Sequence, residues 1–299
     1  MRVLVTGGAG FIGAWIVKRL VDAGLTPVIF DLVDSRRLIA TIAGEETARS
    51  VTFHTGDIAD TDTVLRAAEG CGAIIHLAGL LTPACRADPV KGAQVNLIGT
   101  LNVFLAARAQ RMPKVLYMSS AGVFGPDDAE TPRPTTLYGA FKLGGEFSAK
   151  AFYADDGIAS VGFRPFVVYG PGREGGLSAG PSLACRAAAW GESYTIPFTG
   201  EFDMIHVDDV AAAFMTALGA PIDGARVLNL LGAQTDDQAV IAAIRAAEPK
   251  AQITASGPPM PVVTPSPDPN VAVLLPGWTP RPLAQGVAET IDFYRRTPR

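Results

Sequence analysis

Two residues four positions apart, Tyr138 and Lys142 in the stretch TTLYGAFK, could together move a proton. Four positions along an α-helix make about one turn, so both side chains share a face if this segment is helical. A free tyrosine has a pKa of about 10, but a lysine one turn away favours its ionised form. The pair could therefore act as the acid/base for an alcohol proton, with simple packing as the alternative role of Tyr138.

A hydroxyl group that holds the substrate oxygen would complete such a site. The stretch YMSSAGVFG places Ser119 and Ser120 at the carboxyl end of an apolar run that is typical of a buried strand. Ligands of doubly wound sheets lie at the carboxyl ends of the strands. We therefore expect these serines close to the Tyr138 and Lys142 pair.

A glycine-rich stretch, VLVTGGAGFIG, follows an expected strand and opens an expected helix. It matches G-x-G-x-x-G through Gly8, Gly10 and Gly13, or G-x-x-G-x-x-G through Gly7, Gly10 and Gly13. Both patterns leave a turn without Cβ atoms, and both direct backbone N–H groups of a helix N-terminus at a pyrophosphate. An ordinary glycine-rich turn is the alternative.

Asp31 ends the next expected strand, TPVIFD, about 20 residues after the glycines. A carboxylate there can accept hydrogen bonds from both ribose hydroxyls of NAD, and it would repel the 2′-phosphate of NADP. Arg36 and Arg37 follow closely and leave NADP open, unless they only begin a solvated helix. Asp57, in TGDIAD after the third strand, either reaches the adenine edge or caps a helix. The pattern favours an NAD site.

Short β-branched runs alternate with longer helical patterns over the first two thirds of the chain. This alternation predicts an α/β fold with a doubly wound parallel sheet of the Rossmann type. Glycine- and proline-rich stretches after residue 166 indicate a smaller, mixed α/β substrate-binding part, where Thr235 and Gln238 have capping-box spacing. The expected strands are 2–6, 26–31, 50–55, 72–78 and 114–120, and the expected helices include 11–23 and 92–111.

The composition argues against several classes of function. The formal net charge is −4 over 299 residues and the basic residues are scattered, so no nucleic-acid partner is expected. Cys71, Cys85 and Cys185 form no C-x-x-C pair, so we expect neither a metal site nor a disulfide framework. No apolar run reaches the roughly 18 residues of a membrane span, and no signal peptide is evident. We expect a cytoplasmic protein with no membrane partner.

Together, TGGAGFIG, Asp31, GDI, HLAG, SSAGVFG and YGAFK resemble the extended short-chain dehydrogenase/reductase superfamily, specifically the NAD-dependent epimerase/dehydratase family. RPFVVYGPG and MIHVDDVA extend the resemblance to residues 1–232. It implies two domains, which are an NAD-binding Rossmann domain of residues 1–165 and 207–231 and a substrate-binding domain of residues 166–206 and 232–299.

The resemblance also implies roles for individual residues. Tyr138 would be the acid/base, Lys142 would bind the nicotinamide ribose and lower the pKa of Tyr138, and Ser120 would aid catalysis. Phe124 replaces a usual tyrosine whose role is packing. The implied NAD-binding residues are Gly7, Gly10, Phe11, Ile12, Gly13, Asp31, Asp57, Ile58, Leu77, Ala78, Gly79, Asn96, Tyr138, Lys142, Phe166 and Val168.

Several polar residues near these motifs have competing interpretations. Asn96 would sit beside the cofactor or be a helix-surface amide. His76 ends a buried strand and is expected to be structural. His206 and Asp208 are expected to be architectural, with Asp208 or Asp209 capping the next helix.

Two glycines, Gly144 and Gly145, fall inside the helix that would carry Tyr138. Each costs about 1 kcal/mol relative to alanine in a helix. They predict that a neighbouring helix or strand approaches the backbone closely there.

The reaction is defined less sharply than the fold. Dehydratases of the family carry Thr-Asp-Glu where this chain has Ser120, Ala121 and Gly122, so elimination of water is not expected. Its nucleotide-sugar epimerases commonly carry Arg-Asp where this chain has Phe202 and Asp203, and an aromatic ring cannot replace a phosphate-binding guanidinium.

We therefore expect a dehydrogenase that transfers a hydride between NAD and a secondary alcohol carbon of a small sugar, sugar acid or hydroxy acid. Arg173 and Arg186 are candidates to meet an anion in this carbohydrate-like substrate, with a surface role as the alternative for each. The alternatives are a nucleotide-diphosphate-sugar 4-epimerase with tightly bound NAD, and a non-enzymatic cofactor sensor or scaffold. Family members often dimerise through helices that here span 92–111 and 138–155, so a homodimer is expected.

Overall fold

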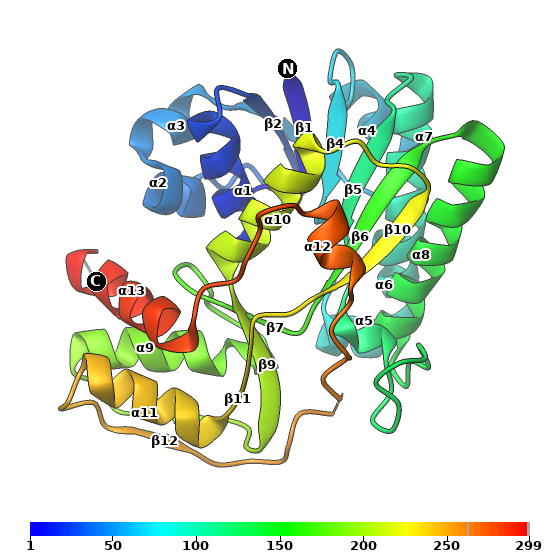
Figure 1. The fold of residues 1–299 in the computed structure, drawn as a ribbon. Helices are drawn as coiled ribbons and strands as arrows, with labels where there is room; N and C mark the ends of the chain where they lie inside the picture. The colour runs from blue at the N-terminus through cyan, green and yellow to red at the C-terminus, as the bar shows by residue number, and fades with distance from the viewer. Residues whose placement is uncertain (262, 298–299) are drawn as a thin grey trace.

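A seven-stranded parallel sheet forms the centre of the computed structural model, which describes residues 1–261 and 263–297 (Figure 1). The strand order is β10-β6-β5-β4-β1-β2-β3, so the expected Rossmann-type doubly wound sheet is confirmed. The expected substrate-binding range 232–299 includes residues 262 and 298–299, which lie outside the described residues. The strands are β1 Arg2–Thr6, β2 Thr26–Asp31, β3 Thr52–Thr55, β4 Ala73–His76, β5 Lys114–Met118, β6 Ala159–Pro165 and β10 Ala225–Leu230.

Helices cover both faces of this sheet (Figure 1). Successive side chains of a strand point to opposite faces, so Val3 and Val5 pack against α1 and α10 while Leu4 packs in the core beneath α4, α7 and α8. No helix in the described part of the chain is long and apolar enough to cross a membrane. The helices on the two faces are α1 Phe11–Asp22, α4 Thr61–Ala67, α7 Gly99–Ala109, α8 Leu137–Asp156 and α10 Val207–Gly219.

The helix expected over 92–111 is present as a continuous helical segment with a π-helical turn inside it. It consists of α6 Pro89–Ala93, a π-helical turn η1 Gln94–Ile98, and α7. The helix α8 packs against this segment at its two glycines: a Cβ on Gly144 would lie 3.2 Å from Leu97 Cδ1, and one on Gly145 would lie 3.4 Å from Thr100 Cγ2. The predicted close approach at these glycines is confirmed.

A second, smaller sheet follows the first, with the order β11-β9-β7 (Figure 1). Strands β7 and β9 are parallel, whereas β9 and β11 are antiparallel. We propose that these elements, with a separate β8 and β12 pair, form the expected substrate-binding domain. They are β7 Val167–Tyr169, β8 Tyr194–Ile196, β9 Glu201–His206, β11 Ala233–Asp236, β12 Ile253–Ala255, α9 Gly180–Trp190, α11 Asp237–Ala247 and α13 Leu283–Arg296.

Short helices complete the chain. A 3-10 turn, η2, follows β5 and carries the residues after Ser120, and another, η3, follows β7. Their bounds and those of the remaining helices are α2 Arg37–Ala43, α3 Glu45–Ser50, α5 Thr82–Ala87, α12 Asn270–Leu274, η2 Ala121–Val123 and η3 Leu177–Ala179.

The predicted capping box of Thr235 and Gln238 is wrong. Helix α11 begins one residue later, because β11 extends to Asp236. The Asp236 carboxylate accepts a hydrogen bond from the Ala239 backbone N–H at 2.7 Å and so caps the helix.

The expected capping of α10 by Asp208 or Asp209 is also wrong. His206 caps this helix, since its Nδ1 accepts a hydrogen bond from the Asp208 backbone N–H at 3.2 Å. Both aspartates lie in the first turn and bind Arg281, and Asp208 also binds Arg19 at 2.7 Å. The architectural role expected of His206 and Asp208 agrees with these contacts.

Candidate active site

Tyr138 and Lys142 lie in the first turns of α8, beside the end of β5. Thr136 starts this helix by accepting a hydrogen bond from the Gly139 backbone N–H at 3.1 Å. A Cβ on Gly139 would overlap the carbonyl oxygen of Gly122, so only glycine lets the helix pack this closely on η2. The local sequence thus brings Tyr138 against the turn that follows β5.

Lys142 is buried, with 7% of its side chain exposed. Its Nζ donates a hydrogen bond to the Met118 carbonyl at 2.8 Å and lies 5.9 Å from the centre of the Tyr138 ring. Burial lowers the pKa of Lys142 to about 8, although Cys85 and Glu146 act in the opposite direction. The amine is therefore held at a fixed point beneath Tyr138.

Two neighbours act on the phenol of Tyr138. Burial raises its pKa, while the Ser120 side chain, by hydrogen bonding, and the Arg173 charge lower it. The Ser120 hydroxyl also accepts a hydrogen bond from the Gly122 backbone N–H at 3.0 Å, which orients it at the start of η2. Ser120 and Arg173 therefore both favour the phenolate form of Tyr138.

A cavity of about 360 Å³ lies above these residues. Met260 and Pro261, from the proline-rich segment after β12, form part of its wall, as do Arg173 and Ser178. Its lining brings together the expected catalytic residues Ser120, Tyr138 and Lys142 and the expected cofactor-binding residues Ile12, Leu77, Gly79, Phe166 and Val168.

The glycine turn between β1 and α1 has the shape that a dinucleotide requires. Gly7 has φ of +69°, and a Cβ there would lie 2.7 Å from the Ala78 backbone nitrogen. A Cβ on Gly13 would lie 2.6 Å from Gly8 Cα. No side chain caps α1, so the N–H groups at its start, which include those of Phe11 and Ile12 after Gly10, can face a pyrophosphate.

Asp31 ties the end of β2 to this turn. Its Oδ2 accepts a hydrogen bond from the Ala9 backbone N–H at 3.1 Å, and its Oδ1 accepts one from Leu32 at 2.8 Å. Burial raises the pKa of Asp31, and these two hydrogen bonds oppose that rise. The carboxylate therefore lies beside the glycine turn, at the carboxyl end of β2.

Asp57 does not cap a helix, because Asp60 caps α4 through the Thr63 backbone N–H at 3.2 Å. Asp57 instead accepts a hydrogen bond from Ala59 and forms an ion pair with Lys91 at 2.6 Å. The neighbouring Ile58 is buried against α7, where a Cβ on Gly99 would lie 2.9 Å from it. Asp57 and Ile58 follow β3, and neither of them lines the cavity beside Tyr138.

Asn96 and His76 are both buried polar residues under the cavity. Asn96 is only 1% exposed and exchanges hydrogen bonds with the Leu80 backbone, so the helix-surface interpretation is wrong. His76 hydrogen-bonds Thr6 at 2.7 Å and Thr100 at 3.1 Å, and burial lowers its pKa to about 3. This neutral, fully bonded histidine has the structural role that the sequence predicts.

A buried ion pair that the sequence analysis missed supports the catalytic helix. Glu146, one turn after Lys142, accepts hydrogen bonds from Ser119 Oγ at 2.5 Å and from Arg164 Nε at 2.7 Å. Arg164 also pairs with the second carboxylate oxygen at 2.5 Å. Ser119 follows β5 and directly precedes Ser120, whereas Arg164 lies on β6. The network therefore ties α8 to β5 and β6 next to the catalytic residues. A charged residue on the buried face of α8 was the available signal.

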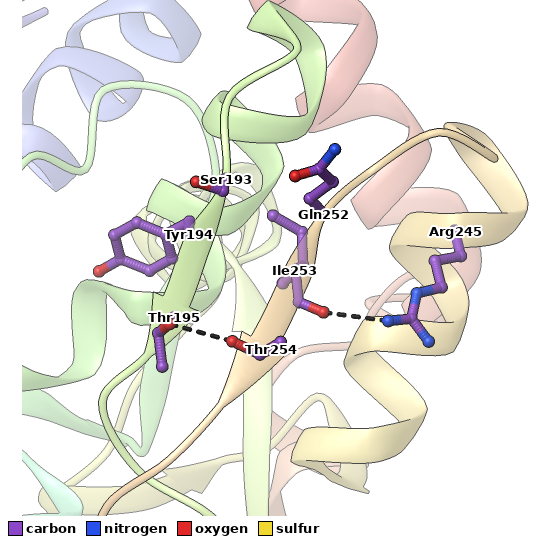
Figure 2. Close-up of a pocket in the computed structure, with 7 residues that line it drawn as sticks. All are labelled: Ser193, Tyr194, Thr195, Arg245, Gln252, Ile253 and Thr254. Atoms are coloured by element: carbon purple, nitrogen blue, oxygen red, sulfur yellow. Dashed lines mark hydrogen bonds between the residues drawn. The ribbon is translucent and has the colours of Figure 1, made fainter.

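A second hollow lies along the paired strands β8 and β12, beside Arg245 of α11 (Figure 2). Its polar groups bond one another: Thr195 and Thr254 share a hydrogen bond at 3.0 Å, and Arg245 donates to the Ile253 carbonyl at 3.1 Å. Within residues 1–261 and 263–297, no three histidine, cysteine or acidic side chains come together as metal ligands do. We find no acid/base arrangement in the lining of this hollow, which is Ser193, Tyr194, Thr195, Arg245, Gln252, Ile253 and Thr254.

Comparisons with known proteins agree with this geometry. The chain is 32% identical to UDP-glucose 4-epimerase of Mycolicibacterium smegmatis over 99% of both chains. It is 32% identical to UDP-glucose 4-epimerase of Bacillus subtilis, over 78% of this chain and 75% of that one. The structure of Thermus thermophilus UDP-glucose 4-epimerase in complex with NAD superimposes with a TM-score of 0.82 at 28% identity, covering 100% of both chains.

The family match covers most of the chain. Residues 3–230 match the model of the NAD dependent epimerase/dehydratase family, as the motifs predict. The protein is an enzyme of the extended short-chain dehydrogenase/reductase type, and its cofactor is NAD. This chain belongs to the NAD dependent epimerase/dehydratase family.

Proposed function

We propose that the protein is an NAD-dependent 4-epimerase of a UDP-sugar. The observation that carries the proposal is the similarity to a UDP-glucose 4-epimerase over 99% of both chains. The cavity beside the glycine turn is consistent with it, because Ser120, Tyr138 and Lys142 lie together there. The proposal takes up the alternative function that the sequence left open.

In the proposed reaction, Tyr138 removes the proton of the sugar hydroxyl and returns it at the end of the cycle. NAD, when bound, would supply a reversible hydride acceptor for the carbon that carries this hydroxyl, which allows the carbon to be inverted. Ser120 holds the sugar oxygen by a hydrogen bond, and Arg173 stabilises the phenolate. Lys142, fixed by the Met118 carbonyl, binds the nicotinamide ribose.

We also propose the cofactor-binding residues by their places in the fold. Asp31 would hold the adenosine ribose, while Asp57 and Ile58 would lie near the adenine. Lys142 and Tyr138 would contact the nicotinamide ribose. The residues around the glycine turn, the end of β4 and the start of β7 would complete the set: Gly7, Gly10, Phe11, Ile12, Gly13, Leu77, Ala78, Gly79, Asn96, Phe166 and Val168.

A homodimer in the cytoplasm is part of the proposal. Phe147 on α8 is 60% exposed and Ile98 on η1 is 41% exposed, which leaves apolar side chains on the two helices expected to pair. All three cysteines are free, as in a reducing compartment. Sedimentation at micromolar concentration should give a dimer, and a monomer would contradict this part.

A specific observation favours a second candidate, an NAD-dependent dehydrogenase of a small sugar, sugar acid or hydroxy acid. Phe202 is 1% exposed and packs edge-on against Phe198, with 5.1 Å between the ring centres. The position where related epimerases carry an arginine therefore offers no hydrogen-bond donor to a diphosphate. A substrate without a diphosphate would not need one.

One assay separates the two candidates. Purified enzyme is incubated with UDP-galactose and catalytic NAD, and the product is identified by chromatography. In parallel reactions, free sugars and sugar acids are incubated with excess NAD while absorbance at 340 nm is followed. The 4-epimerase should form UDP-glucose without net NADH. Steady NADH formation from free sugars or sugar acids, with no conversion of any UDP-sugar, would replace this proposal by the dehydrogenase.

A further inference from the structure

Arg173 is a cation in the active-site cavity that has no acidic partner in the described chain. It follows β7 and lines the cavity together with Tyr138. Its guanidinium donates to the Ser178 hydroxyl at 2.8 Å and, with longer bonds of 3.3 Å, to the carbonyls of Val168 and Gly175. The nearby Arg37, by contrast, pairs through both terminal nitrogens with a carboxylate.

The charges around the cavity are unbalanced. None of the residues that line it is an aspartate or glutamate, and its cations are Arg173 and Lys142. Lys142 is already bonded to the Met118 carbonyl. Burial lowers the pKa of Arg173, which reflects the cost of holding this charge away from water. An anionic ligand would offset that cost.

The geometry also limits which anion fits. A guanidinium binds one carboxylate through two parallel hydrogen bonds, and its Ser178 neighbour offers a further hydroxyl. The guanidinium of Arg173 has neutral hydrogen-bond acceptors but no acidic partner in the described chain, so its single charge matches one carboxylate better than a diphosphate. Tyr138 and Arg173 share the cavity and influence each other's charge, so the bound group lies near the carbon that reacts.

We propose that Arg173 binds a carboxylate of the substrate, next to the carbon whose hydroxyl Tyr138 deprotonates. This inference rests on the proposed 4-epimerase function and deepens it, because it makes a UDP-uronic acid the preferred substrate over a neutral UDP-hexose. Arg173 is thereby a specificity-determining residue of the site.

The test compares UDP-glucuronate with UDP-glucose, which differ at the carboxylate alone. Binding of each to the enzyme with NADH is measured by calorimetry, and 4-epimerisation is measured in parallel. The proteins are the wild type, Arg173→Gln, Arg173→Lys and the control Arg186→Gln, whose target stacks on Trp190 outside the cavity lining.

The wild type should prefer UDP-glucuronate, and Arg173→Gln should weaken its binding roughly 10- to 100-fold while UDP-glucose binding stays unchanged. Arg173→Lys should recover only part of the loss, because an ammonium lacks the planar pair of donors. The control Arg186→Gln should behave as the wild type. Binding of NAD and the thermal midpoint, measured for each variant, should stay at the wild-type values.

Equal losses for both sugars would assign Arg173 to the diphosphate, and weaker NAD binding alone would assign it to the cofactor. Either result, or no loss at all, overturns the inference. If both sugars bind but neither is epimerised, the 4-epimerase proposal fails while the binding difference still tests Arg173. If UDP-glucuronate does not bind the wild type, free glucuronate is used as the probe, and its failure to bind would also overturn the inference.

Discussion

Replacing Glu146 by glutamine should destabilise the protein strongly, because it leaves a buried positive charge without its partner. The carboxylate is 3% exposed and Arg164 is 14% exposed, and the two are joined by two hydrogen bonds. Removing one partner of such a pair costs about 3–5 kcal/mol. With an unfolding entropy of about 2.1 cal/mol/K per residue over 299 residues, this loss lowers the melting temperature by roughly 5–8 °C.

The measurement is calorimetric melting of the wild type, Glu146→Gln and a matched control, Glu248→Gln. Glu248 also pairs with an arginine, Arg295, but those side chains are 27% and 39% exposed. An exposed pair contributes at most about 1 kcal/mol, so the control should shift the melting temperature by less than roughly 2 °C. If Glu146→Gln melts no lower than the control, the reasoning about the buried network is refuted.

Three further predictions concern the cofactor turn, the proton transfer and a buried acid. Gly13→Ala places a Cβ against the backbone of Gly7 and Gly8, which cannot move away. The substitution should lower the free energy of unfolding by about 1–3 kcal/mol and weaken NAD binding in a fluorescence titration. Gly219→Ala, where a Cβ meets nothing within 4 Å, should do neither. Tyr138→Phe should lower kcat by about 10²- to 10⁴-fold, and undiminished turnover would assign this residue a packing role. Burial raises the pKa of Asp203 from 3.8 to about 6, so the wild type loses stability as the pH rises through this interval. Asp203→Asn does not titrate and should therefore gain roughly 3 kcal/mol over the wild type between pH 3.5 and pH 7.5 in paired melting curves. A difference between the two proteins that does not change with pH would contradict this.

The fold was predictable because its signals are local. Buried parallel strands are short apolar runs, and the helices between them have a period of 3.6 residues. The glycine turn and the spacing of Tyr138 and Lys142 are likewise visible over a few residues. Local patterns, however, do not show where an extra backbone residue enters a helix, so the π-helical turn over 94–98 was missed and the two interpretations of Asn96 stayed open.

The walls of the site were less predictable because they depend on contacts between distant segments. Arg173 was a candidate to meet an anion, but its place beside Tyr138 could not be predicted because it lies in a glycine-rich loop without periodicity. Met260 comes from a proline-rich segment that only the fold brings to the cavity. The Glu146 and Arg164 pair required knowing that α8 and β6 are neighbours. The cap of α11 was predicted wrongly for a similar reason, because the start of this helix depends on how far β11 pairs with β9.

The most direct test of the proposed 4-epimerase follows the hydrogen at the reacting carbon. UDP-galactose carrying deuterium at C4 is converted with catalytic NAD, and the UDP-glucose formed is examined by NMR. Because the hydride leaves and returns within one site, we expect the product to keep its deuterium at an inverted C4. Loss of the deuterium to solvent, or its accumulation in free NADH, would contradict the account.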